Sequence, residues 1–555
     1  MKPNPAPYLL ALVLVVLAQG LYASHLNKLY YQKFGPFFDS MAYTNEMAEI
    51  LTTAKEEGIG AGVAASFHGG TVSLPWLTVS LLSPVLGYSR LVGVWMQEFW
   101  LAVLAISVFF YLHRYRGAPA AVSALLSIPF LSFFAVYRHN GGVADFRMDL
   151  FLYTFLSLMA VWYLATLETS SRLPWLLSGL FLLCTILNRA TAPVYMAAMF
   201  GPPLAGRFLL RKQERLLLLR RTALYWGVPF ALAAAAVSVN WQFIHYYYFV
   251  WGADPNANLP LRQSLGHLLL AWKSLGPGLG AAAALMFCLQ LATHWKPRHP
   301  LAMLGSVDWQ LLYMGFAPAL MLAAKGAGLN FLASMPCVFG WLLFAIAPVR
   351  GPLRFRTLSA IGIGAMLAVC CFYAGQGYAF HTQPGDNRIA TMPALQRGLS
   401  LMRDDAIAHG KREIEFTTSH LVDFQASALR NVLVYELGAA VHKGAYRLPD
   451  GLLVRASYEG KFSPAVPLNW DQDLPGKTDD EKLAFLADVA GKSIDYYFLP
   501  DDPSIDWMEK NRPGNFINTK MRGLKAKLLA SGLWQPVGEP LVASEYETVI
   551  LYARR

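Results

Sequence analysis

The stretch YRHNGGVADFRMDLFLYTF, residues 137–155, indicates how this chain folds, because it joins two apolar segments through a run of charges. One apolar segment begins at Pro119 and the other covers residues 150–165. The ionisable residues between them are Arg138, His139, Asp145, Arg147 and Asp149. Charges at the end of a membrane span are costly to place and usually mark function. The alternative is a solvated loop in which Arg147 neutralises the two aspartates.

The composition of the whole chain is that of a membrane protein. Of its 555 residues, 55% are hydrophobic and 15% are charged, whereas soluble domains average about 25% charged residues. Several apolar runs approach or exceed the ~20 residues that cross a bilayer. The net charge of +11 therefore indicates basic flanks of membrane spans and not a nucleic-acid-binding surface. We expect a polytopic α-helical protein that contacts membrane lipid.

The cysteines predict neither a disulfide framework nor a cysteine-based metal site. They are Cys184, Cys288, Cys337, Cys370 and Cys371. All five lie in apolar runs, and no pair has the spacing of a metal-binding motif. If the tail after Cys371 lies outside the cytoplasm, it folds without cystines.

The alternation of apolar and basic segments predicts about eleven membrane spans with the N-terminus in the cytoplasm. The expected spans are 7–24, 92–112, 118–136, 149–167, 174–206 as two helices, 222–242, 277–293, 309–324, 329–348 and 357–378. With the division of 174–206 near Arg189, every short inward loop is basic, as the positive-inside rule requires. The most basic segment, 207–221, resembles an amphipathic helix at the membrane interface.

Two domains are expected from the change in character near residue 378. Residues 1–378 form the membrane domain with an outward loop at 25–90, and residues 379–555 form a soluble extracytoplasmic domain. In this tail, helix-like segments alternate with strand-like ones, which favours an α/β fold. The expected helices are 393–409, 423–438, 479–490 and 519–531, and the expected strands are 413–418, 494–499 and 547–552.

The outward loop 25–90 carries two candidate functional residues. Asp39, in FGPFFDSMAY, precedes an expected helix whose apolar side suits a membrane surface. It is interpreted either as the N-cap of that helix or as a general base at the membrane boundary. His68, in SFHGGTVSLPW, is a candidate substrate or metal ligand. Because no ligand cluster surrounds it, a plain surface role is the alternative.

Further candidates face outward in the same topology. Asp145 and Asp149 are four residues apart, so a helix that begins there places both carboxylates on one face. Arg189, Lys325 and Arg138 are candidates to bind a phosphate, since guanidinium and ammonium groups both pair with its oxygens. Lys325 also suits a helix end whose ammonium group reaches the interface.

Aromatic residues gather in the loop 243–276, which reads FIHYYYFVWGADPNANLPLRQ over 243–263. Tyr247 and Trp251 suit the lining of a sugar or lipid cleft. An aromatic belt at the membrane surface is the alternative.

The order of these features resembles the GT-C superfamily of membrane glycosyltransferases, especially the group of protein O-mannosyltransferases and the aminoarabinose transferase of lipid A. In that pattern the first span is followed by an acidic residue with an interfacial helix, then a segment with His and Pro, then an arginine before the second span. The matching segments here are FFDSMAY, FHGGTVSLPW and YSRLVG. GGVADFRMD then matches the acidic loop, and LNRATAPVY the hairpin with a basic residue. The resemblance covers residues 7–206.

The chain departs from the pattern at three points. Asp39 is followed by Ser40, where many relatives carry a second acidic residue. His68 is followed by two glycines, where strings such as His-Pro-Pro are usual. Asn469-Trp470-Asp471 does not match the WWDYG signature of oligosaccharyltransferases, which disfavours that branch.

The resemblance implies an inverting glycosyltransferase that moves a sugar from a polyprenyl-phosphate donor to a glycan, lipid or protein acceptor. The reaction is expected at the outer face of a bacterial-type inner membrane. Asp39 would be the base, while Asp145 or Asp149 would position the acceptor, replace Asp39 as base, or share a divalent metal with it. No other cofactor is expected. Arg189, Lys325 and Arg138 would hold the donor phosphate, and His68, Tyr247 and Trp251 would contact substrate.

Two other functions stay open. A transporter or flippase of lipid-linked sugars would place ionisable groups near the membrane midplane and often shows inverted repeats. Here the charges lie at span ends and the sequence shows no repeat. A polymerase or ligase of surface polysaccharide is chemically closer to the leading hypothesis and harder to separate from it.

Overall fold

The computed structural model describes most of the first half of the chain and most of the tail. The described residues are 4–33, 39–67, 73–128, 148–210, 212–245, 260–266, 310, 313, 314, 317, 320, 321, 391–419, 424–442, 444–457, 470, 474–501, 523–543 and 547–555. The expected spans 277–293, 329–348 and 357–378 lie outside them.

The chain forms two compact units. The first comprises Met1–His25, Val63–Leu82 and Gly93–Phe380, and the second comprises Leu26–Gly62, Ser83–Val92 and His381–Arg555. Much of the loop expected to accompany the membrane domain therefore folds with the tail. The division of the chain between membrane and soluble domains at residue 378 stays a prediction.

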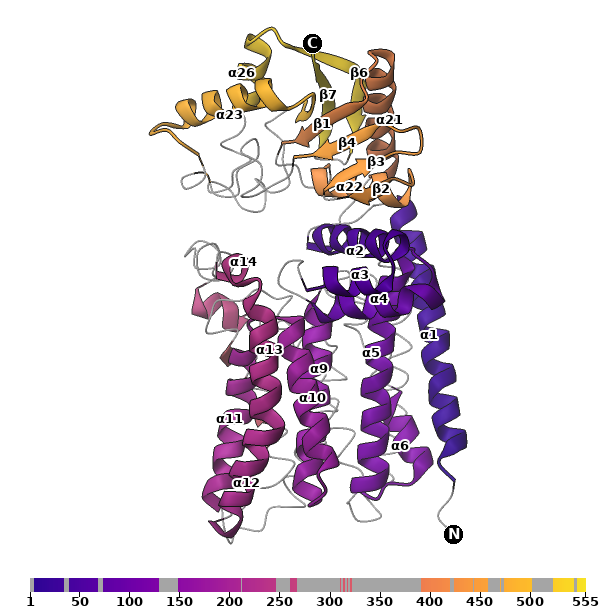
Figure 1. Ribbon diagram of the computed structural model, residues 1–555, viewed down its shortest axis with the longest axis vertical. Coiled ribbons are helices and arrows are strands. Elements are labelled where there is room, and N and C mark those ends of the chain that lie inside the picture. The colour runs from indigo at the N-terminus through magenta and orange to yellow at the C-terminus, as the bar shows by residue number, and fades with distance from the viewer. Residues whose placement is uncertain are drawn as a thin grey trace. The chain divides into compact units, whose positions relative to one another are not determined.

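The chain up to residue 245 is helical wherever the structure describes it, apart from short connections (Figure 1). The elements are α1 (Ala6–Lys33), α2 (Asp39–Glu56), α3 (Ile59–Ala65), α4 (Leu74–Leu86), α5 (Leu91–Phe110), η1 (Tyr111–Tyr115), α6 (Ala120–Ser127), α9 (Met148–Glu168), α10 (Leu173–Asn188), α11 (Ala192–Leu210), η2 (Lys212–Glu214), α12 (Arg215–Thr222), η3 (Ala223–Gly227), α13 (Val228–Ser238) and α14 (Trp241–His245). Of these, η1 and η3 are π-helical turns and η2 is a 3₁₀ turn.

Three helical segments are long and apolar enough to cross a membrane in the part of the chain that the structure describes. They are Ala6–Lys33, Leu91–Tyr115 and Leu150–Glu168. Leu74–Leu86 and Leu173–Asn188 are shorter apolar helices. The three long segments coincide with the expected spans 7–24, 92–112 and 149–167, whereas the total of eleven spans stays a prediction.

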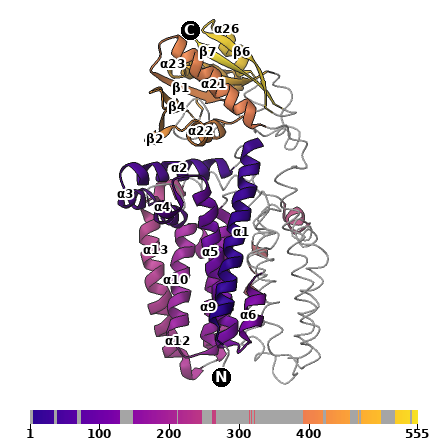
Figure 2. The same cartoon turned by 90° about the vertical axis from the view of Figure 1, so that its right-hand side faces the viewer.

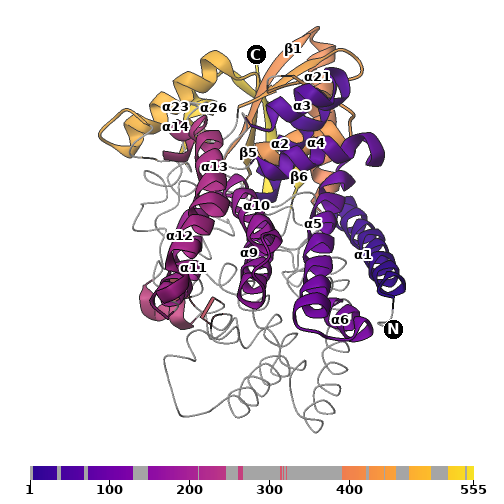
Figure 3. The same ribbon diagram turned by 60° about the horizontal axis from the view of Figure 1, so that its bottom comes forward.

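The helix α9 is the most enclosed of the three long apolar segments, with 94% of its apolar window buried. On one side α5 lies beside it (Figure 2). There the Trp162 indole donates to Ser107 Oγ at 3.2 Å. On the other side α10 lies between α9 and α13 (Figure 3). Gly179 of α10 allows that approach, because a Cβ atom there would lie 1.8 Å from the Tyr225 carbonyl oxygen.

The expected division of 174–206 into two helices is confirmed. The helix α10 ends at Asn188, and α11 begins at Ala192 with Pro193 in its first turn. Arg189 between them has extended backbone angles, φ −154° and ψ 122°. Proline suits the first turn of a helix because its missing N–H would have no partner there.

The expectation of one interfacial helix over 207–221 is wrong. The helix α11 continues to Leu210, and α12 begins at Arg215 and runs through η3 directly into α13. Arg207 is buried, and its guanidinium donates to the Thr166 hydroxyl at 2.8 Å and to the Thr166 carbonyl at 3.0 Å. The first basic residue of the segment therefore belongs to helix–helix packing.

The tail forms an α/β fold around a sheet of seven strands in the order β2-β3-β4-β1-β5-β7-β6. The strands are β1 (Glu413–Thr418), β2 (Ala440–His442), β3 (Ala445–Arg447), β4 (Leu453–Ala456), β5 (Tyr496–Pro500), β6 (Trp534–Val542) and β7 (Thr548–Arg554). The central strand β1 is parallel to both of its neighbours, β4 and β5, and the other pairs are antiparallel. This arrangement confirms the expected α/β class of the tail.

Helices cover both faces of this sheet because successive side chains of a strand point to opposite faces. The helices are α21 (Met392–Ala408), α22 (Ala426–Tyr435), α23 (Asp479–Ser493) and α26 (Leu524–Ala530). Tyr496 and Phe498 of β5 join one apolar core with α21 and α22. Tyr497 and Leu499 join a second core with α23 and α26.

Most expected elements of the tail are confirmed. The helices α21, α22, α23 and α26 and the strands β1, β5 and β7 lie where the sequence predicts them. The helix α23 begins at a capping box, in which Thr478 Oγ1 accepts from the Glu481 amide and Glu481 Oε2 accepts from the Thr478 amide. The strands β2, β3, β4 and β6 are additional to the expectation.

The helix α2 packs within the second unit, on α22 and β2. Ala48 joins the core that contains α21 and α22. The side-chain amide of Asn45 donates to the Ser427 carbonyl at 2.9 Å. Met47 and Leu51 are also buried. The apolar side expected to lie on a membrane is therefore at least partly a protein contact.

Candidate functional site

The structure describes the predicted site residues unequally. Six of them lie outside the described residues: His68, Arg138, Asp145, Tyr247, Trp251 and Lys325. Asp39 is the first residue of α2 and Asp149 is the second residue of α9, and only their backbone is described. Arg189 is described in full. Asp39 belongs to the second unit, and Asp149 and Arg189 belong to the first.

Arg189 lies at the C-terminal end of α10 and is half-buried. Its amide donates to the Thr185 carbonyl at 3.2 Å, and its own carbonyl accepts from the Ala192 amide at 2.9 Å. These two bonds fix the backbone of the connection between α10 and α11. The sequence places the arginine here through Asn188-Arg189 and Pro193, which interrupt the long apolar run.

Two of the sequence motifs meet at this connection. The Ser73 amide, at the end of FHGGTVS, donates to the Leu187 carbonyl of α10 at 2.8 Å. At the other end of the same segment, the Phe67 carbonyl accepts from the Asn240 amide group at 2.9 Å. The segment that contains His68 is therefore anchored on either side beside the ends of α10 and α13.

The helix α9, which follows the acidic loop in the sequence, begins at this end of the first unit. The helices α9 and α10 pack along each other and are joined by a turn over residues 169–172, so they run antiparallel. At about 1.5 Å of rise per residue, Asp149 and Arg189 lie within roughly one helical turn of each other along the hairpin. The backbone thus places these two predicted residues at one end of one hairpin.

The electrostatics at this end favour an anion. The N-terminal ends of α4, α9 and α11 lie at the connection around Arg189, because each of these helices begins beside the end of α10. Helix N-terminal ends carry partial positive charge and unpaired amides, which attract phosphate and carboxylate groups. An arginine among them adds a fork of donors that matches phosphate geometry.

Metal binding is not tested by the described side chains. They contain no group of three or more His, Cys, Asp and Glu residues that would hold a metal ion. Because the carboxylates of Asp39, Asp145 and Asp149 are not among them, the divalent metal stays a prediction.

One buried polar group was missed by the sequence reasoning. Glu98 of α5 is fully enclosed, and Gln97 and Gln19 are also buried. Gln19 of α1 faces Glu98, yet no polar atom of these three side chains has a partner with hydrogen-bond geometry in the described structure. The signal was a lone acidic residue in the apolar run WMQEFW, and such residues inside membrane spans are usually functional.

The charged residues of the second unit have a different arrangement. Asp405 accepts from Arg555 at 2.7 Å and from the Tyr496 hydroxyl at 2.8 Å. Burial acts to raise the pKa of Asp405, but these hydrogen bonds and the nearby charge of Arg555 outweigh it, so its pKa lies below the usual value. Hydrogen bonds thus favour the ionised form of this carboxylate.

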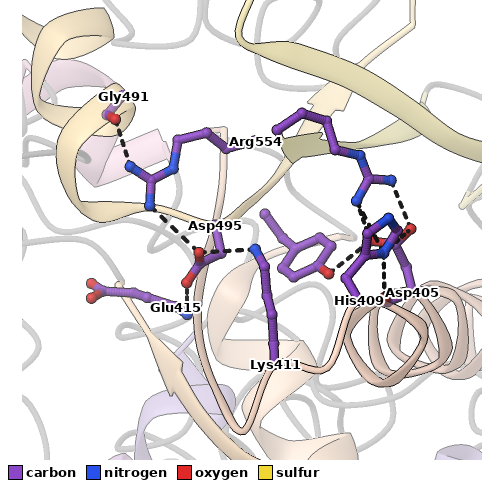
Figure 4. Close-up of polar contacts among 9 residues, drawn as sticks. Asp405, His409, Lys411, Glu415, Gly491, Asp495 and Arg554 are labelled. Atoms are coloured by element: carbon purple, nitrogen blue, oxygen red, sulfur yellow. Dashed lines mark hydrogen bonds and ion pairs between the residues drawn. The ribbon is translucent and has the colours of Figure 1, made fainter.

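Asp495 forms a second network beside the first. It accepts from Lys411 at 3.1 Å and from the Glu415 amide at 2.9 Å, and Arg554 lies at 3.5 Å (Figure 4). Both networks tie the last two residues of the chain to the sheet and to α21. They are structural in character.

Comparison with solved structures identifies the fold. None of the protein-family models matches the sequence, and no curated protein matches it. The structure of ArnT from Cupriavidus metallidurans bound to undecaprenyl phosphate superposes with a TM-score of 0.52 at 11% identity, over 98% of this chain and 98% of that chain. The oligosaccharyltransferase AglB from Archaeoglobus fulgidus, in complex with an inhibitory peptide and a dolichol-phosphate, gives 0.51 at 10% identity, over 95% and 72%.

At such identities the likeness concerns the fold. It extends over nearly the whole chain, whereas the sequence motifs cover only residues 7–206. An oligosaccharyltransferase is among the similar structures although the chain lacks the signature sought at Asn469-Trp470-Asp471. The chain has the GT-C-like fold of membrane glycosyltransferases, as the resemblance of its sequence predicted.

Proposed function

We propose that this protein is a glycosyltransferase that moves a sugar from a polyprenyl-phosphate donor to a glycan, lipid or protein acceptor. The observation that carries the proposal is the end of the α9–α10 hairpin, where Arg189 lies among the N-terminal ends of α4, α9 and α11. The similar structures of ArnT and AglB contain undecaprenyl phosphate and dolichol-phosphate, respectively. A lipid phosphate is therefore the ligand that best suits this end of the first unit.

The transfer breaks one bond and forms another at the anomeric carbon. The acceptor hydroxyl attacks this carbon, and the bond to the phosphate oxygen breaks, so that the phosphate leaves with the electron pair. A carboxylate takes the acceptor proton, and cations stabilise the departing phosphate. Attack from the side opposite the leaving group inverts the anomeric configuration.

We assign the roles as the motifs suggest. Asp39 is the base, and Asp145 or Asp149 positions the acceptor, with a divalent metal between the acidic groups as the alternative. The donor phosphate is held by Arg189, Arg138 and Lys325, and His68, Tyr247 and Trp251 contact substrate. The reaction takes place at the outer face of a bacterial-type inner membrane, with the N-terminus in the cytoplasm.

The test is a transfer assay with the purified protein in lipid nanodiscs and a panel of synthetic undecaprenyl-phosphate sugars. The acceptor is a detergent extract of bacterial envelope, or water in a slow background reaction. The measured quantity is the undecaprenyl phosphate that sugar transfer releases. Asp39→Asn is expected to lower turnover by about 10²–10⁴-fold while donor binding persists, since general bases contribute that much. Glu57→Gln, at an exposed position just after α2, is the matched control.

Each other outcome reassigns or removes a role. Full activity of Asp39→Asn together with loss in Asp145→Asn or Asp149→Asn moves the base to the acidic loop. Movement of the lipid-linked sugar across proteoliposomes without any transfer would contradict the glycosyltransferase and support the transporter.

A further inference from the structure

Arg90, the arginine of the YSRLVG motif, has no role in the proposed reaction, although the structure surrounds it closely. Its side chain is only 13% exposed. The guanidinium donates through Nε to Asn27 Oδ1 at 3.1 Å and lies over the Tyr31 ring at 3.7 Å from the centroid. Both partners are in the last turns of α1, and all three residues belong to the second unit.

The tail supplies the other side of this environment. The Tyr435 ring lies 5.9 Å from the guanidinium carbon, and Glu436 Oε1 lies 3.8 Å from Nη1. Tyr435 and Glu436 end α22, where the helix carbonyls carry partial negative charge that favours a cation. Burial lowers the pKa of Arg90 while the two tyrosines and Glu436 act to raise it, and an arginine stays charged at neutral pH.

The helix α22 also binds α2, through one hydrogen bond near each of its ends. The Tyr435 hydroxyl donates to the Thr44 carbonyl at 3.4 Å. The side-chain amide of Asn45 donates to the Ser427 carbonyl at 2.9 Å. Ala48, one turn further along α2, is part of the core of the α/β fold. Tyr435 therefore contacts both the Arg90 guanidinium and the helix that begins at Asp39.

We propose that Arg90 is a positioning residue that locks α2 onto the C-terminal α/β fold through Tyr435 and Glu436. The α/β fold then sets the location of α2, the helix that begins at Asp39, and contributes to the transferase reaction. This inference rests on the proposed function, in which Asp39 is the base. It also explains why an arginine in a loop is surrounded by two aromatic rings and a carboxylate.

The test combines one readout that needs no activity with one that does. Hydrogen exchange of the full chain in nanodiscs is compared between the parent protein, Arg90→Met and Arg90→Lys. We expect peptides covering residues 44–56 to exchange at least about tenfold faster in Arg90→Met, because an opened helix loses its amide protection. Peptides from α21 report whether the α/β fold stays intact, and Arg447→Met, at an exposed arginine of β3, is the matched control.

The second readout is turnover with the undecaprenyl-phosphate sugar that the panel identifies. Arg90→Met is expected to lower kcat about tenfold or more with the donor KM unchanged, and Arg90→Lys to recover part of kcat. A purely structural role would lower the amount of folded protein and leave kcat per folded molecule unchanged. Tyr435→Phe, which removes only the hydroxyl, is a milder variant if Arg90→Met does not fold.

The outcomes separate this inference from the proposed function. Unchanged exchange over 44–56 in Arg90→Met overturns the locking role, whatever the activity. Faster exchange with unchanged kcat overturns the positioning role. Failure of the parent protein to transfer any sugar of the panel overturns the proposed function and with it the positioning role, while the exchange result still decides whether Arg90 locks α2.

Discussion

The environments of fully or partly buried carboxyl groups differ between the two units. In the second unit, Asp405 and Asp495 each accept hydrogen bonds from a basic side chain and from another donor. In the first unit, Glu98 is fully enclosed without a partner of hydrogen-bond geometry in the described structure. Where the first unit does pair a carboxylate, Glu168 with Arg116 at 2.7 Å, the pair lies at a helix end.

The difference separates charges that stabilise the fold from charges that cost stability. A saturated carboxylate such as Asp405 holds the chain terminus in place. A carboxyl group without partners inside an apolar bundle lowers stability and is retained only if it serves function. Glu98 is therefore a better candidate for function than the paired carboxylates Asp405 and Asp495 of the tail.

The largest effect is expected from Gly179→Val, which tests the packing of α10 on η3 and on the start of α13. A Cβ atom at Gly179 would overlap the Tyr225 carbonyl oxygen, so α10 and α13 would have to separate. We expect the free energy of unfolding to fall by about 3 kcal/mol or more. The loss would be measured as a lower unfolding midpoint or as aggregation in detergent. Gly206→Ala in α11, where a Cβ atom meets nothing within 4 Å, is the control and should be neutral.

The next effect concerns the saturated carboxylates. Asp405→Asn should cost about 1–3 kcal/mol in the α/β fold, because it removes a charged acceptor from Arg555 and Tyr496. Hydrogen exchange of α21 and β7 peptides in the full chain measures this loss. Protection that stays equal to the parent value would show that the network is dispensable.

The same carboxylate predicts a dependence on pH. The pKa of Asp405 is lower in the folded than in the unfolded chain. The ionised carboxylate therefore contributes its full stabilisation of the fold at pH values above its unfolded-chain pKa of about 3.9. This stabilisation is lost as the pH falls through the lower folded value. The parent α/β fold should therefore lose exchange protection in this acid range, and Asp405→Asn should lose less. An equal acid response in both proteins would contradict the assignment.

The smallest effect on stability is expected from Glu98→Gln, which also replaces a carboxyl group by an amide. This effect has the opposite sign to that of Asp405→Asn. Glu98→Gln removes the cost of an ionisable group in an apolar bundle and should raise stability by about 1 kcal/mol. An unfolding midpoint above that of the parent protein, with lower transferase activity, would identify Glu98 as functional. A lower midpoint would show that Glu98 is a structural partner after all and would remove the contrast with Asp405.

The sequence predicts those features that depend on local patterns. Length and hydropathy predict the three long apolar helices of the described part. Asn188-Arg189 with Pro193 predicts the division of the long apolar run. The three-residue strands β2 and β3 are too short for a periodic signal. The strand β6 contains Pro536, Gly538 and Pro540, which a strand tolerates only at the sheet edge or at an irregularity.

The site depends on contacts that no local pattern encodes. The bond from the Ser73 amide to the Leu187 carbonyl joins backbone atoms far apart in sequence, so side-chain identity gives no hint of it. An amphipathic helix such as α2 fits a membrane surface and a protein surface equally well, and only the structure shows that Ala48 lies in the core of the α/β fold. Arg90 was noted in the sequence only as part of a motif, because its partners come from both ends of the chain.

The most direct test of the central claim is the binding of undecaprenyl phosphate at Arg189, measured by native mass spectrometry of the purified protein. Arg189→Gln is compared with Arg172→Gln, an exposed arginine at the opposite, turn end of the α9–α10 hairpin. We predict that Arg189→Gln weakens binding about tenfold or more, since a hydrogen bond to a charged group is removed, while Arg172→Gln binds like the parent protein. Unchanged binding in Arg189→Gln, or loss in Arg172→Gln alone, would contradict the account.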